Sequence, residues 1–151
     1  MDNNELDIKA YKNLQTIHWV FCAVMASFIV IIFAFNKLVG YNVITKNDNS
    51  LLYVAFLATS IFPIISNYVF YKRLEAIDLD EPVKFRFQNF LNANVIRYLW
   101  ISGAGVLNLM VWFFTATLLL AIFNGFLLLV LIIIRPIKFK VIRTLRLKPI
   151  K

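Results

Sequence analysis

Residues 98–134 read YLWISGAGVLNLMVWFFTATLLLAIFNGFLLLVLIII and contain no Asp, Glu, Lys or Arg. An α-helix rises about 1.5 Å per residue and a bilayer core is about 30 Å thick, so roughly 20 residues cross it once. These 37 residues are too many for one crossing and hold two only if the turn between them is tight. The least apolar place to turn is Phe114 to Thr117. The stretch therefore predicts two membrane spans joined by a short turn.

Two further windows, residues 13–36 and 49–71, are also free of formal charge. They are 24 and 23 residues long, so each predicts one span. The mean hydropathy of +0.75 and the apolar content of 61% are typical of an integral membrane protein, and runs this continuous exclude barrel strands. The predicted fold is all-α, an integral membrane four-helix bundle of two helical hairpins with spans at 17–36, 51–71, 92–114 and 117–134.

Three segments lie outside these spans: an N-terminal segment 1–16, a connecting loop 72–91 and a basic tail 135–151. Within the loop, Asp78, Asp80 and Glu81 precede Pro82. A capping acid followed by proline is a helix-start signal, and we expect this helix to run on as the third span. The first apolar run is longer than the core of a cleaved signal peptide, so we expect it to be retained.

The basic residues are distributed unequally between the two sides of the membrane. With four spans, both termini and the loop 72–91 lie on one side, which collects 14 of the 16 Lys and Arg residues. The other side carries only Lys37 and Lys46. Because cytoplasmic segments are enriched in Lys and Arg, we expect both termini to be cytoplasmic.

The tail begins where Pro136 interrupts the fourth span. Beyond it, apolar and basic residues fall on opposite helical faces, with Ile137, Val141, Ile142 and Leu145 on the apolar one. Such a segment suits contact with anionic lipid headgroups or with a protein partner, and both stay open. We expect Arg97, just inside the third span, to extend to the headgroups or to pair with a loop acid or a partner. The residues predicted to make headgroup or partner contacts are Arg97, Arg135, Lys138, Lys140, Arg143, Arg146 and Lys148.

Residues suited to catalysis or cofactor binding are scarce. All eight acids lie outside the spans, which argues against proton-coupled exporters of the small multidrug resistance type, whose first helix carries a glutamate. His18 and Cys22 could supply only two metal ligands, and the three acids of the loop suit a helix start better than a cation site. No catalytic triad, phosphate loop or nucleic-acid recognition module is present. We expect no enzyme activity, no cofactor, no metal and no nucleic-acid partner.

The spans carry small and amide side chains that favour close helix packing. On the fourth span, Thr117, Ala121 and Gly125 repeat every four residues. This packing could join the four spans to each other or to a neighbouring subunit, and both uses stay open. The other candidate packing residues are Ala55, Thr59, Pro63 and Asn67 on the second span, Gly103, Gly105 and Asn108 on the third, and Asn124 on the fourth, with the two last amides expected to hydrogen-bond across helices.

The region from Phe87 to Lys148 carries NVIRYLWISGAG, a tight turn, an apolar fourth span and then IIIRP and VIRTLRL. It resembles small, uncharacterised four-span proteins of the bacterial inner membrane. That family often has an acid followed by Gly-Pro where this chain has Ser102-Gly103-Ala104. The resemblance covers about the last 60 residues and implies a bacterial cytoplasmic membrane.

Together these features predict a non-enzymatic accessory or assembly subunit that packs against a larger inner-membrane complex and contacts anionic headgroups with its tail. The first alternative is a homo-oligomeric channel or facilitator. The second is a lipid-binding membrane protein. A channel would be lined by the polar residues Thr59, Ser60, Ser66, Asn67, Ser102 and Asn108.

Overall fold

The computed structural model describes residues 8–39 and 50–147, and every regular element in these ranges is a helix, which confirms the all-α prediction. Three helices are long and apolar enough to cross a membrane, and a fourth crossing is available if α4 and α5, bent by 64° at their break, count as one span. The helices are α1 (Ile8–Val39), α2 (Ser50–Glu75), α3 (Val83–Thr115), α4 (Leu118–Ile133) and α5 (Lys138–Thr144).

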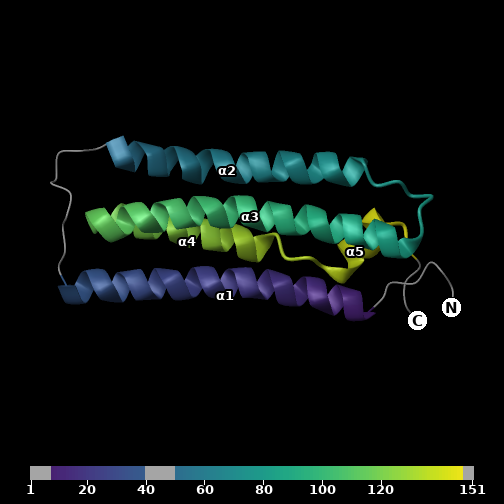
Figure 1. The fold of residues 1–151 in the computed structure, drawn as a ribbon, viewed down its shortest axis with the longest axis horizontal. Coiled ribbons are helices and arrows are strands. Elements are labelled where there is room, and N and C mark those ends of the chain that lie inside the picture. Colours follow the sequence, from purple (N-terminus) through teal and green to yellow (C-terminus); the bar gives the residue numbers. More distant parts are fainter. Residues whose placement is uncertain (1–7, 40–49, 148–151) are drawn as a thin grey trace.

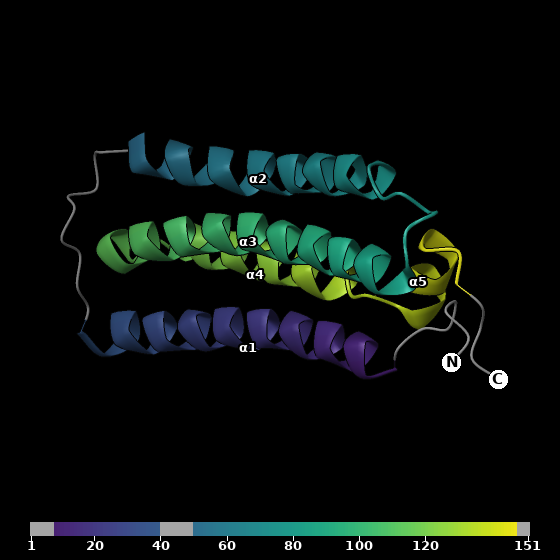
Figure 2. The same cartoon turned by 45° about the vertical axis from the view of Figure 1, so that its right-hand side comes forward.

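The four long helices run side by side, with α3 between α1 and α2 (Figures 1 and 2). α3 packs against α1, α2 and α4, whereas α1 and α2 make little direct contact with each other. The predicted pairing of the first two spans as a hairpin is therefore not confirmed. A short turn keeps α3 and α4 next to each other. Ten residues separate α1 from α2 in the sequence, and a connection of this length does not require the two helices to be neighbours.

The first three helices extend well beyond the predicted spans. α1 begins nine residues before Ile17, and α3 begins nine residues before Asn92. A charge-free window marks only the part of a helix that can lie in the hydrocarbon core of the bilayer. The helix itself can be longer, because its backbone hydrogen bonds can continue into polar sequence. α2 also continues through Pro63 without a break. By contrast, α4 has only 16 residues, which is about 24 Å of helix at the usual rise.

The start of α3 differs from the predicted acid cap. Pro82 itself occupies the cap position, and no side chain bonds the first backbone N–H groups. The carboxylate of Asp78 instead accepts a hydrogen bond of 2.9 Å from the backbone N–H of Asp80. The acids therefore shape the turn before the helix, because an Asp side chain readily accepts a hydrogen bond from the N–H two residues on.

The turn between α3 and α4 lies at Ala116 and Thr117. Ala116 adopts the left-handed conformation with φ 50°, and its N–H donates to the carbonyl of Trp112 at 2.9 Å. A left-handed residue after the last helical turn ends a helix and redirects the chain. This tight turn brings α4 back along α3.

Apolar side chains are buried in three clusters along the helices. The middle cluster joins α1, α3 and α4 around Met25 and Leu127, and a second lies near the α3–α4 turn around Trp112. The third lies at the opposite end, which we call the basic end: here α1 and α3 begin, α2 ends, and α5 packs (Figure 1). Its buried members are Leu14, Phe70, Ile77, Phe87, Phe90, Ala93, Val141, Leu145 and Leu147.

The outer surface of the long helices is also apolar. Exposed large side chains occur on each of them, among them Val30, Ile64, Met110 and Ile122. Water-soluble proteins rarely expose contiguous apolar surface on this scale. A surface of this kind matches helices that are covered by lipid or by other membrane helices.

Candidate functional site

Positive charge gathers at the basic end. Of the 13 Lys and Arg residues that lie in the described ranges, only Lys37 is at the other end. This asymmetry agrees with the charge distribution expected from the spans. The twelve at the basic end are Lys9, Lys12, Lys72, Arg73, Lys84, Arg86, Arg97, Arg135, Lys138, Lys140, Arg143 and Arg146.

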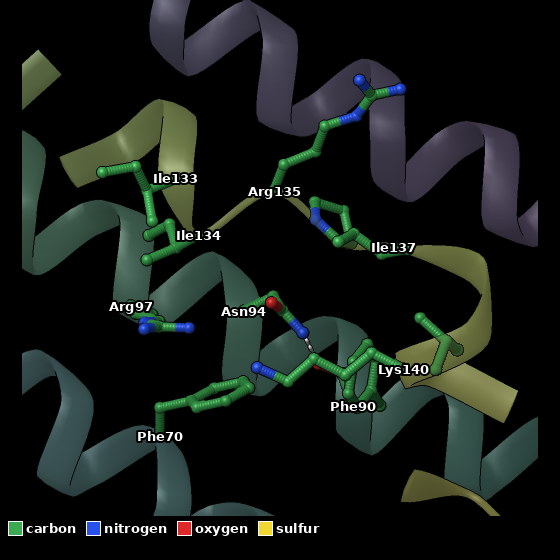
Figure 3. Close-up of a pocket in the computed structure, with 11 residues that line it drawn as sticks. Phe70, Phe90, Asn94, Arg97, Ile133, Ile134, Arg135, Ile137 and Lys140 are labelled. Atoms are coloured by element: carbon green, nitrogen blue, oxygen red, sulfur yellow. Dashed lines mark hydrogen bonds between the residues drawn. The ribbon is translucent and has the colours of Figure 1, made fainter. Parts of the chain in front are cut away.

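A pocket of about 200 Å³ lies at this end, between α2, α3 and the break that separates α4 from α5. Figure 3 shows its walls, with the phenylalanines and α3 residues on one side and the α4–α5 break on the other. None of its lining residues is acidic. They are Phe70, Phe90, Asn94, Arg97, Ile133, Ile134, Arg135, Pro136, Ile137, Lys140 and Val141.

Arg97 is the most deeply placed charge in this pocket, since only 7% of its surface is exposed. Its terminal Nη2 donates a hydrogen bond to Oδ1 of Asn67 on α2. Its guanidinium carbon lies 4.6 Å from the ring centroid of Phe70, a cation–π distance. In the structure Arg97 contacts an amide oxygen and an aromatic ring of α2 rather than a loop acid, and its expected contact with headgroups stays a prediction.

The pocket receives a second cation from α5. Lys140 extends toward Arg97 from the opposite wall, whereas Arg135 turns away toward α1 (Figure 3). The guanidinium carbon of Arg135 lies 5.5 Å from the ring centroid of Trp19. The side-chain amide of Asn94 lies between the two walls and donates to the carbonyl of Phe90 at 2.8 Å (Figure 3). Arg97 and Lys140 thus point into one space that has no carboxylate in its lining.

α5 is held to the helices by its apolar face. Val141 and Leu145 are fully buried in the apolar cluster of the basic end. The chain itself therefore covers most of this face, whereas contact of the basic residues with lipid headgroups or with a protein partner stays a prediction. The remaining basic residues predicted on the tail, Lys138, Arg143 and Arg146, are exposed, and Lys148 lies outside the described residues.

Two long-range hydrogen bonds fix the chain around the break. Nη1 of the buried Arg86 donates to the carbonyl of Leu145 at 2.7 Å. The hydroxyl of Tyr11 on α1 donates to the carbonyl of Pro136 at 3.1 Å. Both ends of α5 are therefore tied to other helices, and this sets the position of the pocket wall that carries Lys140.

Of the two amides expected to bond across helices, one does so. Nδ2 of Asn108 on α3 donates to Oγ1 of Thr59 on α2. Nδ2 of Asn124 donates instead to the carbonyl of Leu120 in its own helix at 2.9 Å. Asn124 lies opposite Gly105, close enough that a Cβ there would come within 3.7 Å of its Oδ1. α3 thus offers it no side-chain partner at that point.

The small residues of the spans fall into three groups. Ala55 and Thr59 are buried, and a Cβ at Gly105 would come 2.6 Å from the methyl carbon of Met25, so these residues serve contacts within the chain. A Cβ at Gly103 or Gly125 would meet no atom within 4 Å. The others, Thr117, Ala121 and Pro63, are half-buried.

His18 and Cys22 form a buried pair on α1, with 3.7 Å between Sγ and Nε2. The imidazole is fully buried beside the ring of Tyr98, whose centroid is 5.2 Å away. In the described ranges, no group of three or more His, Cys, Asp and Glu residues is placed to hold a metal ion. The pair packs within the middle apolar cluster.

Comparisons with protein-family models, curated proteins and solved structures give no match to this chain.

Proposed function

We propose that the chain is a non-enzymatic accessory or assembly subunit of a larger complex in the bacterial cytoplasmic membrane. In this proposal α1, α2, α3 and the α4 segment each cross the bilayer, and the basic end and both termini lie in the cytoplasm. A partner's helix packs against the small-residue surface of α4. The proposal rests on the geometry of the glycines and on the distribution of charge.

The observation that carries the proposal is the open space at Gly125. Together with Thr117 and Ala121, it forms a small-residue surface every four residues along α4. None of these residues is fully buried, and a Cβ at Gly125 would meet nothing. Small residues let helix backbones approach closely in membranes, where apolar side chains gain nothing over lipid. Ala121 packs in part against the apolar cluster near the α3–α4 turn, but internal packing leaves the space at Gly125 open, so it is available to another helix.

Gly103 on α3 supports the same conclusion from a second surface. It borders a shallow hollow of about 290 Å³ with Phe62, Ile96, Leu99 and Trp100. A hollow with a glycine at its floor suits a large side chain from a neighbouring helix. Either surface could also accept a second copy of this chain.

The orientation follows from the positive-inside rule. Twelve of the 13 basic residues in the described ranges lie at the basic end, and Lys and Arg are enriched on the cytoplasmic side of membrane proteins. Five of them, Arg135, Lys138, Lys140, Arg143 and Arg146, lie on the segment after α4. Attraction to anionic lipid adds about 1 kcal/mol for each basic residue near the surface.

The channel hypothesis is less well supported by the positions of its polar residues. Thr59, Ser66 and Asn108 are buried within the chain. Asn67 accepts the hydrogen bond of Arg97, and the exposed Ser60 donates to the carbonyl of Phe56 in its own helix at 3.0 Å. A pore between subunits needs its polar residues on the outer surface, and most of these face inward.

The proposal is tested by purification in mild detergent, with the mass of the complex measured on a native gel. We expect the parent chain to co-migrate with another membrane protein at stoichiometric level and Gly125→Leu to lose it, because the larger side chain fills the contact surface. Ala34→Leu is the control, since it introduces the same side chain at an exposed position on α1 and adds only one carbon fewer. A parent chain that migrates alone, or equal retention by both variants, contradicts the proposal.

A further inference from the structure

We propose that the pocket at the basic end binds the phosphate group of an anionic glycerophospholipid, held between Arg97 and Lys140. The pocket is separate from the small-residue surface of α4. Lipid binding there does not depend on the chain being an accessory subunit.

The charges of the pocket favour the binding of an anion. Arg97 and Lys140 reach toward each other from opposite walls, and the lining contains no carboxylate (Figure 3). Two cations that face one space repel each other, and the repulsion is stronger where water is partly excluded. An anion between them converts this repulsion into two attractive interactions. A phosphate offers several oxygens, which suit both the planar guanidinium and the ammonium.

The hydrogen bonding of Arg97 leaves a donor for such a ligand. Its side chain is 93% buried, being 7% exposed, and its Nη2 is taken by Asn67. Its Nε, however, has no hydrogen-bond partner among the residues that the structure describes. A buried donor on a charged group is costly to leave unsatisfied, so a ligand oxygen in the pocket would remove that cost.

The position of the pocket favours a lipid over a soluble anion. It opens at the break after α4, where the apolar sequence gives way to Arg135 and Pro136. This is the level at which a membrane helix leaves the hydrocarbon and meets the headgroup phosphates. Two exposed apolar residues, Ile133 at 77% and Ile137 at 59%, border the pocket. The cations inside the pocket suit the phosphate of a lipid headgroup, and the isoleucines at its rim suit the acyl chains of the same lipid.

The walls of the pocket are fixed by contacts that do not involve a ligand. Asn67 and Phe70 hold Arg97, while the Arg86–Leu145 and Tyr11–Pro136 hydrogen bonds hold the chain that carries Lys140. A site that is ordered before binding loses less free energy in ordering its side chains. This distinguishes the pocket from the exposed basic residues elsewhere on α5.

The test compares two lysines of the same helix in the full-length protein. Both lysines are exposed, but Lys140 lines the pocket and Lys138 does not. Binding of phosphatidylglycerol to the protein in mild detergent is measured by native mass spectrometry. We expect Lys140→Gln to weaken binding about tenfold, because it removes a charge-assisted hydrogen bond, and Lys138→Gln to change it less than about twofold. Both variants lose one positive charge.

Three further measurements identify the phosphate group and its source. A diacylglycerol with the same acyl chains should bind far more weakly, since it lacks the phosphate. Inorganic phosphate at millimolar concentration should fail to displace phosphatidylglycerol. Arg97→Lys should also weaken binding, because lysine keeps the charge but not the guanidinium geometry. Equal losses in Lys138→Gln and Lys140→Gln, equal binding of diacylglycerol, or displacement by inorganic phosphate would overturn the proposal.

Discussion

Two polar contacts show how single residues position the helices. Arg97 joins α3 to α2 through Asn67 and Phe70, and Asn108 joins the same helices through Thr59 further along. Both contacts join residues of 49–71 to residues of 87–134, and Arg97 is the one formal charge in these two stretches of sequence. In a membrane, such hydrogen bonds help to fix one helix against its neighbour where apolar packing alone is not selective.

The contact between Asn108 and Thr59 has a measurable coupling free energy. We expect Asn108→Ala and Thr59→Ala to be coupled by about 0.6 kcal/mol and by no more than about 1.7 kcal/mol, the range found for hydrogen bonds between membrane helices. Unfolding of the two single variants and the double variant in mixed detergent micelles gives this value.

Asn92, an exposed residue of the same helix, provides the control. Asn92→Ala combined with Thr59→Ala should show additive effects. Additive effects for the Asn108 and Thr59 pair as well would mean that their hydrogen bond adds nothing to the α2–α3 contact.

Among the elements, α5 departs most from what its sequence predicts. Its pattern of apolar and basic faces predicts contact with a lipid surface, but Val141 and Leu145 pack against the other helices instead. An amphipathic pattern indicates that the apolar face of a helix is covered, but it does not indicate whether lipid or protein covers it. Arg86 and Tyr11, which hold the ends of α5, lie far from it in the sequence. Their role could not be read from local spacing.

The packing of α5 gives a prediction about its local stability. Leu145→Ala should ease the detachment of α5 by up to about 2–5 kcal/mol, the cost of truncating a buried leucine. Deuterium uptake in peptides that cover residues 138–147 should rise accordingly. Phe139→Ala, at a position that is 73% exposed, should leave the uptake unchanged. Parent-like uptake in Leu145→Ala would show that α5 is not held by this contact.

Other elements were predictable because their signals are local. The charge-free windows predicted where the long helices lie, and the least apolar point of residues 98–134 predicted the turn between α3 and α4. The candidate pocket was only partly predictable. Arg97 and Lys140 were both expected to contact headgroups. They are 43 positions apart in the sequence, and helical periodicity does not predict that residues so far apart line one pocket. Asn94 is absent from the predicted residues, although it lies three residues before Arg97 on the same helical face.

Across the whole molecule, apolar and charged residues occupy different regions. Its long helices are apolar outside as well as inside, and twelve of the 13 basic residues in the described ranges lie at one end. α3 and α4 are joined by a tight turn, whereas α1 and α2 flank α3 and scarcely touch. The sequence predicted that α1 pairs with α2, and this is not confirmed because α1 packs against α3 and α4, contacts that local sequence signals do not specify.

In the proposed topology the chain crosses the bilayer four times with its basic end in the cytoplasm. Single cysteines at exposed positions, Lys37→Cys near the end of α1, Lys72→Cys near the end of α2 and Arg143→Cys on α5, test it in a Cys22→Ser background. A membrane-impermeant thiol reagent applied to intact spheroplasts should label Lys37→Cys alone, and the other two only after permeabilisation. Labelling of Lys37→Cys and Arg143→Cys from the same side would contradict the account.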